Sequence, residues 1–330
     1  MRVEGFRCSL TEAESSAVRA AASAAAAVLP DLPNTFPERL PGTFRNQLRA
    51  VASPADEFGF RVFDVFPAGS LGPLPDSPTG ERPTLPETDW TAAMLFLVAD
   101  YLGGLVGYED EKGGALVHDV CPVPGKETFI ENVGADHLGL HTENVHHPLR
   151  PDHVALFCLR ADHDGVAALR VAPVRPALDG IPADLVPVLR EPRFHSLYPT
   201  SFGLDGTGRR PCSAPHPVLG GPAATPTIRF NTHNTTGLDE AAESARRLLD
   251  RRLDETSVRL KLRPGQLAVL NNNFVVHGRT PFRPRYDGRD RWLRRCYAIR
   301  AVPDVVRAAM PRPRVLPRTA RLLGLTPAQR

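Results

Sequence analysis

Three residues of metal-ligating type lie in two separate places in the chain. His141 and Glu143 flank Thr142, and His277 lies far downstream. In an extended strand, residues i and i+2 point to the same side, so the first two side chains can converge on one ion while Thr142 points away. Two histidines and one carboxylate can occupy one face of an octahedral Fe(II), leaving the opposite positions for O₂ and a bidentate co-substrate. The spacing therefore predicts an iron site that His277 completes from a distant strand or loop.

The sequence on both sides of these residues resembles a known family. Residues 136–152 begin Asp-His-Leu-Gly-Leu-His-Thr-Glu-Asn, and residues 277–282 read His-Gly-Arg-Thr-Pro-Phe, followed by an arginine-rich stretch at 287–295. In this order the segments are similar to the clavaminate synthase-like branch of the Fe(II)/2-oxoglutarate oxygenases, within the taurine dioxygenase-like superfamily. That branch includes asparagine, arginine and lysine hydroxylases of antibiotic biosynthesis. The resemblance runs from about Val120 to Tyr297, and the first hundred residues match only loosely.

The resemblance implies roles for individual residues. His141, Glu143 and His277 would be the iron ligands. Arg291 lies fourteen positions past His277, where the family places the arginine that binds the distal carboxylate of 2-oxoglutarate. A planar guanidinium suits that two-pronged contact and stays charged. Arg295 lies at a position resembling the arginine that holds the substrate α-carboxylate in amino-acid hydroxylases, and its parity with Arg291 lets both face the interior of one barrel strand.

Three further residues are predicted to contact the substrate. Asn231 lies where many relatives have an aspartate that does so. Relatives that hydroxylate arginine tend to have acidic residues near positions 229 and 231, but this chain has Arg229 and Asn231. A buried cationic substrate side chain would lack its counter-charge there, which is costly, so free arginine or lysine is disfavoured. His146 closely follows the iron motif and is predicted to line the same pocket.

The chain departs from the family at one co-substrate contact. Relatives usually carry a threonine after the strand that follows the first iron motif, and its hydroxyl helps to bind 2-oxoglutarate. Residues 165–170 read Gly-Val-Ala-Ala-Leu-Arg, with no hydroxyl. One contact to 2-oxoglutarate is therefore missing or supplied elsewhere. This departure motivates the hypothesis of a non-catalytic binding protein on an oxygenase scaffold.

The resemblance implies oxidation of an unactivated C–H bond with Fe(II), 2-oxoglutarate and O₂. Related halogenases replace the carboxylate ligand by a small residue to make room for chloride. Glu143 therefore favours hydroxylation, with desaturation or cyclisation as open alternatives. Arg295 favours an amino acid or a close derivative as the substrate, in natural-product biosynthesis. The same chemistry on a substrate tethered to a carrier protein or peptide is the alternative.

The sequence gives less support to a different metal site, to nucleic-acid binding and to a membrane partner. Glu143, His147 and His153 could form a different metal site by spacing alone, but that set ignores Arg291. The net charge is +3, without a basic stripe interleaved with aromatic residues, so nucleic-acid binding has little support. Five widely spaced cysteines without a CxxC pair indicate free thiols in a reducing cytoplasm. The sequence has neither a signal pattern nor a membrane-length apolar run, so no membrane partner is expected.

The hydrophobic pattern predicts an α+β fold in one oxygenase domain, residues 1–330. Residues 1–115 form a mostly helical N-terminal part, 116–300 a double-stranded β-helix (jelly roll) core flanked by helices, and 301–330 a C-terminal tail. Short apolar runs separated by Pro, Gly, Asp or Asn are typical of such a core. The predicted strands after residue 116 are 117–120, 138–141, 154–159, 166–174, 227–230, 258–262, 267–270 and 292–299.

The remaining elements are predicted from caps, prolines and periodicity. Thr11 caps a helix that runs to about Leu29, where Pro30 stops it. Further helices are expected at 37–52, at 89–105, where the apolar run indicates burial, and at 238–253. A strand is expected at 58–66, and residues 71–86, rich in proline and glycine, form a surface loop or a mobile lid.

Overall fold

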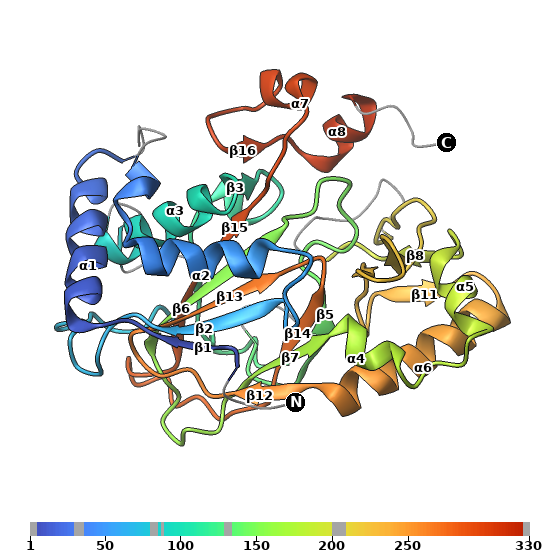
Figure 1. Cartoon of the computed structure of the whole chain (residues 1–330), viewed down its shortest axis with the longest axis horizontal. Helices are drawn as coiled ribbons and strands as arrows, with labels where there is room; N and C mark the ends of the chain where they lie inside the picture. The colour runs from blue at the N-terminus through green and yellow to red at the C-terminus, as the bar shows by residue number, and fades with distance from the viewer. Residues whose placement is uncertain are drawn as a thin grey trace.

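Two β-sheets face each other at the centre of the molecule, and helices cover their outer sides (Figure 1). The structure is a computed structural model that describes residues 5–29, 36–79, 85–86, 89–128, 134–199 and 209–325. Helices and strands both come from well-separated parts of the sequence. The predicted α+β character is confirmed at this level.

The larger sheet has eight strands and collects the N-terminal, central and C-terminal parts of the chain. The first 115 residues of the chain contribute three of these strands in addition to helices. The path order is β1 (Arg7–Ser9), β2 (Phe60–Asp64), β13 (Gln266–Asn271), β6 (His153–Arg160), β15 (Trp292–Ala298), β3 (Leu105–Tyr108) and β16 (Val315–Leu316), and β4 (His118–Val120) also pairs with β15.

The smaller sheet has four strands and carries most of the iron motif. Its order is β12 (Val258–Leu260), β7 (Leu169–Pro173), β14 (Val275–Arg279) and β5 (Leu138–His141), all paired antiparallel. Two short ribbons lie beside it, β9 (Leu219–Gly220) with β10 (Thr227–Ile228), and β8 (Phe194–Ser196) with β11 (Thr235–Gly237).

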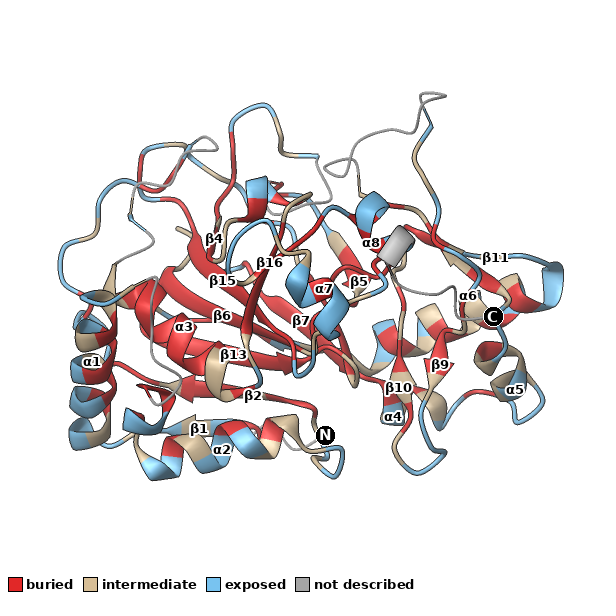
Figure 2. Cartoon of the chain, turned by 90° about the horizontal axis from the view of Figure 1, so that it is seen from above, coloured by how far each residue is buried: buried red, intermediate tan, exposed pale blue. Residues whose placement is uncertain are grey.

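Alternation along the strands divides the apolar residues among three clusters. In β14, Val275 packs between the two sheets, whereas Val276 packs on the outer side of the small sheet. In β15, Leu293 faces the space between the sheets and Trp292 faces the helices. Successive strand residues point to opposite faces, so each sheet has one face in the inner core and one against helices. Figure 2 shows how completely these central strands are buried.

Three helices cover the outer face of the large sheet: α1 (Glu12–Ala26), α2 (Gly42–Ala52) and α3 (Trp90–Tyr101). Thr11 caps α1 as predicted, and Glu14 completes a capping box. The single helix predicted at 37–52 is wrong: a 3₁₀ turn, η1 (Phe36–Arg39), precedes α2, and Pro41 stands between them. A residue before proline is disfavoured in the helical region, which explains the break.

The outer face of the small sheet packs against α4 (Val174–Leu178), α5 (Leu185–Arg190) and α6 (Glu240–Thr256). Asp239 caps α6 by accepting a hydrogen bond from the Ala242 amide at 2.9 Å. The C-terminal region forms α7 (Asp304–Ala308), β16 and α8 (Thr319–Leu325), and a short 3₁₀ helix, η2 (Lys112–Gly114), follows β3. Within the described ranges, no helix combines the length and apolar character needed to cross a bilayer.

Each of the eight predicted strands after residue 116 contains a strand of the structure, although β10 is only two residues long. The sequence prediction missed β14, which has two apolar residues before His277-Gly278 and therefore lacks the length of run that marks a buried strand. The predicted loop at 71–86 and the end of the predicted tail extend beyond the described residues.

Candidate active site

His141 and His277 come from neighbouring strands of the small sheet. They are directly paired in the antiparallel register of β5 and β14, and their ring centroids lie 4.5 Å apart. Val275 packs between the sheets, so His277, two residues later, points to the same interior. Gly278 permits the close approach of the strands, because a Cβ atom there would lie 2.4 Å from the Leu138 carbonyl oxygen. The local sequence therefore places two imidazoles side by side.

Glu143 joins the two histidines from the segment that follows β5. Its Oε1 lies 3.4 Å from His277 Nε2, and one ligand atom from each of Glu143, His141 and His277 lies within 4.8 Å of the others. Asn272 fixes the backbone here: its Oδ1 accepts a hydrogen bond from the Glu143 amide at 2.7 Å, and its Nδ2 donates to the Glu143 carbonyl at 3.2 Å. Asn144, at φ 51°, turns the chain away directly after Glu143. The structure thus brings the predicted triad together.

The protonation states of the triad suit a divalent cation. His141 Nδ1 lies 2.9 Å from the Gly139 carbonyl oxygen, and a proton donated there leaves Nε2 as the ligand atom. Burial, and then the neighbouring His277, lower the pKa of His141 to about 4. Burial alone would raise the pKa of Glu143, but Arg295 and then His277 hold it well below its usual value. The site therefore offers imidazole nitrogens and a carboxylate, a donor set that fits Fe(II).

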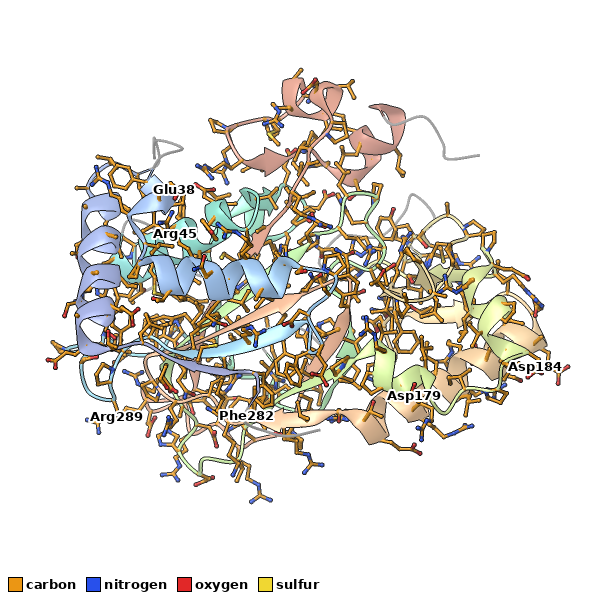
Figure 3. The ribbon with its side chains drawn as sticks, in the orientation of Figure 1. Glu38, Arg45, Asp179, Asp184, Phe282 and Arg289 are labelled. Atoms are coloured by element: carbon orange, nitrogen blue, oxygen red, sulfur yellow. The ribbon has the colours of Figure 1, made fainter. Side chains whose placement is uncertain are left out.

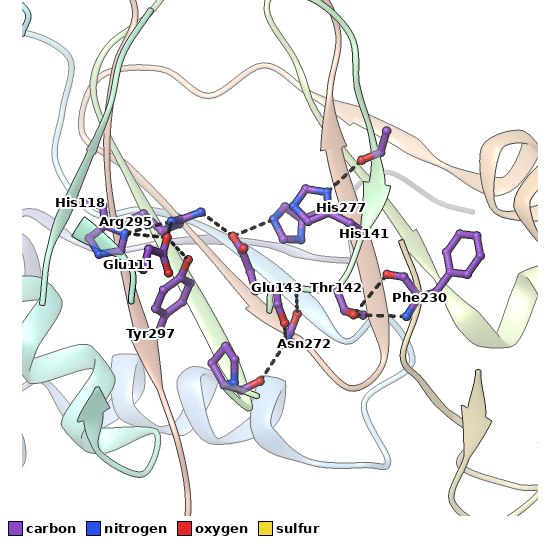
Figure 4. A network of polar contacts seen from close by, with 12 residues as sticks. Glu111, His118, His141, Thr142, Glu143, Phe230, Asn272, His277, Arg295 and Tyr297 are labelled. Atoms are coloured by element: carbon purple, nitrogen blue, oxygen red, sulfur yellow. Dashed lines mark hydrogen bonds and ion pairs between the residues drawn. The ribbon is translucent and has the colours of Figure 1, made fainter. Parts of the chain in front are cut away.

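Arg295 lies at the centre of a polar network beside the triad (Figure 4). Its Nη1 donates to Glu143 Oε1 at 2.8 Å, and its Nη2 donates to Glu111 Oε1 at 2.6 Å. His118 Nδ1 lies 2.9 Å from the same Nη2. Burial would lower the pKa of Arg295, but Glu143 and then Tyr297 raise it above its usual value. The predicted substrate arginine therefore also contacts one of the triad residues, which the sequence did not reveal.

Glu111 is a site residue that sequence reasoning missed. Its Oε1 accepts hydrogen bonds from Arg295 and from the Tyr297 hydroxyl, at 3.2 Å for the latter, whereas its Oε2 is buried without a hydrogen-bond partner in the described part of the chain. Burial would raise the pKa of Glu111, but His118 and Arg295 lower it to about 2. In the sequence Glu111 belongs to a short charged run, which resembles an exposed loop, so no local signal marks it.

Arg291 directly precedes β15 and is buried, with 7% of its surface exposed. Within the described ranges its guanidinium makes no hydrogen bond or ion pair, and its Cζ lies 5.9 Å from the Phe282 ring centroid. Arg279 flanks the same ring at 5.3 Å, and its one hydrogen bond is to the Asp136 carbonyl (Phe282 is labelled in Figure 3). Burial lowers the pKa of both arginines, and Arg291 further lowers that of Arg279, to about 9. Two buried cations here lack a carboxylate partner.

The stretch at 165–170 has no hydroxyl of its own, but Thr280 stands beside it. The Thr280 hydroxyl accepts a hydrogen bond from the Ala168 amide at 2.8 Å and donates to the Val166 carbonyl at 3.2 Å. Arg170 points to the outer side, where its Nη2 donates to Asp254 Oδ1 at 2.6 Å. Residues 165–170 therefore supply no hydroxyl in place of the threonine that relatives use to bind 2-oxoglutarate, and the hydroxyl of Thr280 contacts this stretch from the neighbouring segment.

The three other predicted substrate residues lie on or just beyond a short pairing of residues 141–143 with residues 229–231. Asn231 forms an antiparallel bridge with His141, but its Oδ1 accepts from the backbone amides of the turn that follows it. Arg229 Nε donates to the Val145 carbonyl at 2.7 Å. His146 is buried, and its ring lies 4.4 Å from that of Tyr198. Arg229 and His146 thus lie close together, whereas the Asn231 carbonyl oxygen serves its own turn.

The alternative metal set does not assemble in the structure. Among the described residues, Glu143, His147 and His153 do not place three ligand atoms within reach of one ion. His147 Nδ1 instead lies 2.8 Å from the Leu149 carbonyl oxygen. His153 belongs to β6, on the large sheet. That sequence-based alternative is wrong.

Comparison with known proteins agrees with this geometry. The family profile described as "Taurine catabolism dioxygenase TauD, TfdA family" matches residues 85–297, about two thirds of the chain. The chain belongs to this family. It is 41% identical over 259 residues to L-asparagine oxygenase of Streptomyces coelicolor, covering 78% of this chain and 76% of that relative. It is 32% identical over 270 residues to clavaminate synthase 2 of Streptomyces clavuligerus, covering 81% of this chain and 82% of the relative.

Solved structures of family members resemble this one over nearly the whole chain. Asparagine oxygenase in complex with Fe(II), (2S,3S)-3-hydroxyasparagine and succinate superposes with a TM-score of 0.87 at 36% identity, covering 94% of this chain and 99% of the other. The non-heme iron oxygenase OrfP with Fe and α-ketoglutaric acid gives a TM-score of 0.79 at 28% identity, covering 94% and 99%. This family member is accordingly an oxygenase that depends on Fe(II) and 2-oxoglutarate.

Proposed function

We propose that this oxygenase hydroxylates an unactivated C–H bond of an amino acid or a close derivative in natural-product biosynthesis, and that His141, Glu143 and His277 hold its Fe(II). The observation that carries the proposal is the convergence of these three side chains on one point inside the protein. Two imidazoles and one carboxylate can occupy one face of a metal and leave the rest of its coordination sphere to ligands and O₂. Glu143 is a carboxylate, so no space is opened for a halide, and hydroxylation is favoured over halogenation.

Arg291 is the residue proposed to bind the distal carboxylate of 2-oxoglutarate. It is buried and has no carboxylate partner in the described part of the chain, so it is available to an anionic ligand. A dicarboxylate bound there would neutralise it through a two-pronged contact. When bound together, Fe(II), 2-oxoglutarate and O₂ supply the oxidant for the C–H bond. The protein's task is to orient the ligands and to exclude water.

Arg295 and Glu111 are proposed to recognise the two charged groups that every free amino acid carries. The Glu111 Oε2 atom has no hydrogen-bond partner among the described residues, and a buried carboxylate oxygen without one is costly. An α-ammonium group would supply that partner, and Arg295 stands beside it to pair with the α-carboxylate. This arrangement favours a free amino acid over one whose carboxylate is tied to a carrier protein.

The fold proposed for this site is a double-stranded β-helix within a single domain of residues 1–330. Support comes from the inner cluster, in which β2, β6, β13 and β15 of the large sheet pack against β7, β12 and β14 of the small one. Such a barrel brings side chains from sequence-distant strands to one mouth. His277 and Arg295, from opposite sheets, fit that arrangement.

The test is turnover with Fe(II) and 2-oxoglutarate across the common L-amino acids, measured as succinate formed and as amino acid carrying one added oxygen atom. We expect at least one amino acid to stimulate succinate formation with matching oxygenated product. His277→Ala, the control, should bind less metal and form neither. Stimulation by carrier-tethered amino acids alone would contradict the free-substrate proposal. Iron binding without succinate formation under any condition would contradict the catalytic one.

A further inference from the structure

Buried arginines in this protein fall into two groups according to their partners. Arg294 pairs with Asp89 and Asp119, at 3.2 Å and 3.3 Å. Arg295 pairs with Glu111 and Glu143, and it differs from the other arginines proposed to bind ligands because it has protein carboxylates beside it. Arg291, proposed above to bind 2-oxoglutarate, has no such carboxylate within the described ranges. A buried cation is costly unless an anion neutralises it, so a guanidinium without a protein carboxylate marks a position for an anionic ligand.

A second pair of guanidiniums without an ion pair to any described carboxylate lies beside the segment that follows Glu143. Arg229 and Arg150 are both half-buried, and neither forms an ion pair with any described carboxylate. Arg150 Nη1 lies 3.5 Å from the carbonyl oxygen of Ile228, the residue before Arg229. The nearby Asp152 carboxylate favours the charged form of Arg150 but accepts its own hydrogen bonds from Arg300.

Repulsion by Arg150 is visible in the pKa of Arg229. Burial and the neighbouring Arg150 lower the pKa of Arg229 to about 9, and burial lowers the pKa of Arg150 to about 10. Both stay protonated near neutral pH because these values lie above 7. The protein therefore keeps two positive charges close together without neutralising either.

The register of a short strand pairing places Arg229 on the same side of the chain as the proposed iron ligands His141 and Glu143. The antiparallel bridge between His141 and Asn231 continues through a hydrogen bond from the Thr142 amide to the Phe230 carbonyl at 2.8 Å. That register sets Arg229 opposite Glu143, and side chains of directly opposed residues project from the same face. The Arg229 guanidinium then extends along the carbonyls that follow Glu143.

Neighbouring groups complete a polar wall around this charge. Arg210 donates through Nε to the Tyr198 carbonyl at 2.8 Å and through Nη2 to Asn234 Oδ1 at 3.0 Å. The Tyr198 ring packs on His146. Burial and His147 lower the pKa of His146 well below its usual value, so that imidazole adds no positive charge of its own. The wall thus offers donors and guanidinium charge.

We propose that Arg229 and Arg150 bind an anionic group on the substrate side chain, so that the substrate is an amino acid with an acidic side chain. This inference rests on the proposed function, because it places the α-carboxylate and α-ammonium at Arg295 and Glu111. A side-chain carboxylate would neutralise the second guanidinium pair, as 2-oxoglutarate would neutralise the first. Binding an uncharged amide there would leave both cations without a counter-ion.

The test compares acids with their near-isosteric amides: L-aspartate with L-asparagine and L-glutamate with L-glutamine. The Fe(II)-loaded protein with 2-oxoglutarate is assayed for kcat/KM of coupled oxygenation, and its anaerobic complex for Kd by calorimetry. For at least one pair, we expect the acid to have a kcat/KM at least about thirtyfold higher than its amide and a Kd at least about thirtyfold lower, the scale of a desolvated charge pair. The calorimetric comparison does not depend on turnover.

Variants of Arg229 and Arg150, with a matched control, test whether the preference for the acid depends on this pair. Arg229→Gln should reduce the acid-to-amide ratio about thirtyfold, Arg229→Lys should retain most of it, and Arg150→Gln should lower it independently. The control is Arg259→Gln, on the exposed edge strand β12, which should leave the ratio unchanged. A thermal melt of each variant verifies folding, and Arg150→Gln keeps the test valid if Arg229→Gln fails to fold.

The failures are distinguishable. An amide used as well as its acid, or coupled oxygenation of neutral amino acids only, overturns the acidic-substrate inference and leaves the proposed function intact. A preference for acids that survives in both Arg229→Gln and Arg150→Gln overturns the assignment to this pair. Stimulation by no free amino acid, but by a carrier-bound one, overturns the proposed free substrate and the inference with it.

Discussion

The two guanidinium pairs, Arg279 with Arg291 and Arg150 with Arg229, differ in how they are enclosed. Arg279 and Arg291 are buried and flank the ring of Phe282, whereas Arg150 and Arg229 are half-buried beside backbone carbonyls and flank no common ring. Both proposed ligands must enter and leave in every turnover, because 2-oxoglutarate is converted to succinate as the substrate is converted to product. The two pairs are therefore proposed to bind anionic ligands in the same way, at different degrees of burial.

Both pairs contrast with Arg294. In β15 its side chain points to the face that packs against the helices, opposite to the face that carries Arg295. Arg294 is 2% exposed and is fully served by protein groups: two aspartates, the Thr91 hydroxyl at 3.0 Å and backbone carbonyls. Its charge is neutralised by the fold, whereas the charges of the other two pairs are proposed to be neutralised by ligands. Substitutions at the two kinds of position should therefore differ in what they damage.

The largest expected effect comes from disrupting the proposed metal site, which both guanidinium pairs would serve. His277→Ala deletes a ligand at the metal, so metal content should fall from one equivalent towards none and turnover with any substrate should become undetectable. The loss should exceed the roughly 10- to 100-fold typical of removing a residue that only supports a ligand. Metal analysis after gel filtration checks this. Full metal occupancy in the variant would exclude His277 as a ligand.

Arg294→Met tests the neutralised arginine. Its removal leaves the largely buried carboxylates of Asp89 and Asp119 without their counter-charge. The free energy of unfolding should therefore fall by about 3–5 kcal/mol. Urea denaturation monitored by circular dichroism measures it, with Arg259→Gln as the exposed control. A loss below about 1 kcal/mol, the scale of exposed pairs, would show that Arg294 is not structural.

Arg291→Gln tests the deeper pair. It should raise the KM for 2-oxoglutarate about thirtyfold or more, because the distal carboxylate loses its charge-assisted partner. Succinate formation in the absence of amino acid should weaken in parallel. Arg294→Met protein that remains folded at low temperature should keep its KM for 2-oxoglutarate, which separates the ligand role from a structural one. An unchanged KM in Arg291→Gln would move the co-substrate site elsewhere.

The smallest effect is on stability, and its sign is the informative part. Arg229→Gln removes a charge that repels Arg150, while the glutamine amide can still donate to the Val145 carbonyl. Replacing imperfectly compensated buried charge is often neutral or stabilising. The melting temperature of the ligand-free protein should therefore stay the same or rise. A clear drop, similar to that of Arg294→Met, would mean that Arg229 serves the fold.

The proposed iron triad could be predicted from the sequence because part of its geometry is local and the rest is repeated in a family. The two-residue spacing of His141 and Glu143 follows from strand geometry, and the resemblance supplied His277, Arg291 and Arg295. Most strand positions could also be predicted, because buried strands leave apolar runs bounded by turn residues. The strand that carries His277 escaped notice because its apolar run is too short.

Glu111, Arg150 and Arg279, and the pairing of the last two with the predicted Arg229 and Arg291, were found only in the folded chain. Glu111 meets Arg295 from 184 positions away, and Arg150 meets Arg229 across 79 positions (229 − 150). Whether a charged residue is neutralised depends on which distant side chains the fold places beside it, and one-dimensional patterns hold no record of that. The sequence by itself determined the metal-binding chemistry and the kinds of elements that present it. The tertiary structure decided which positive charges were left for ligands, because only packing determines which charges are buried together and which are not.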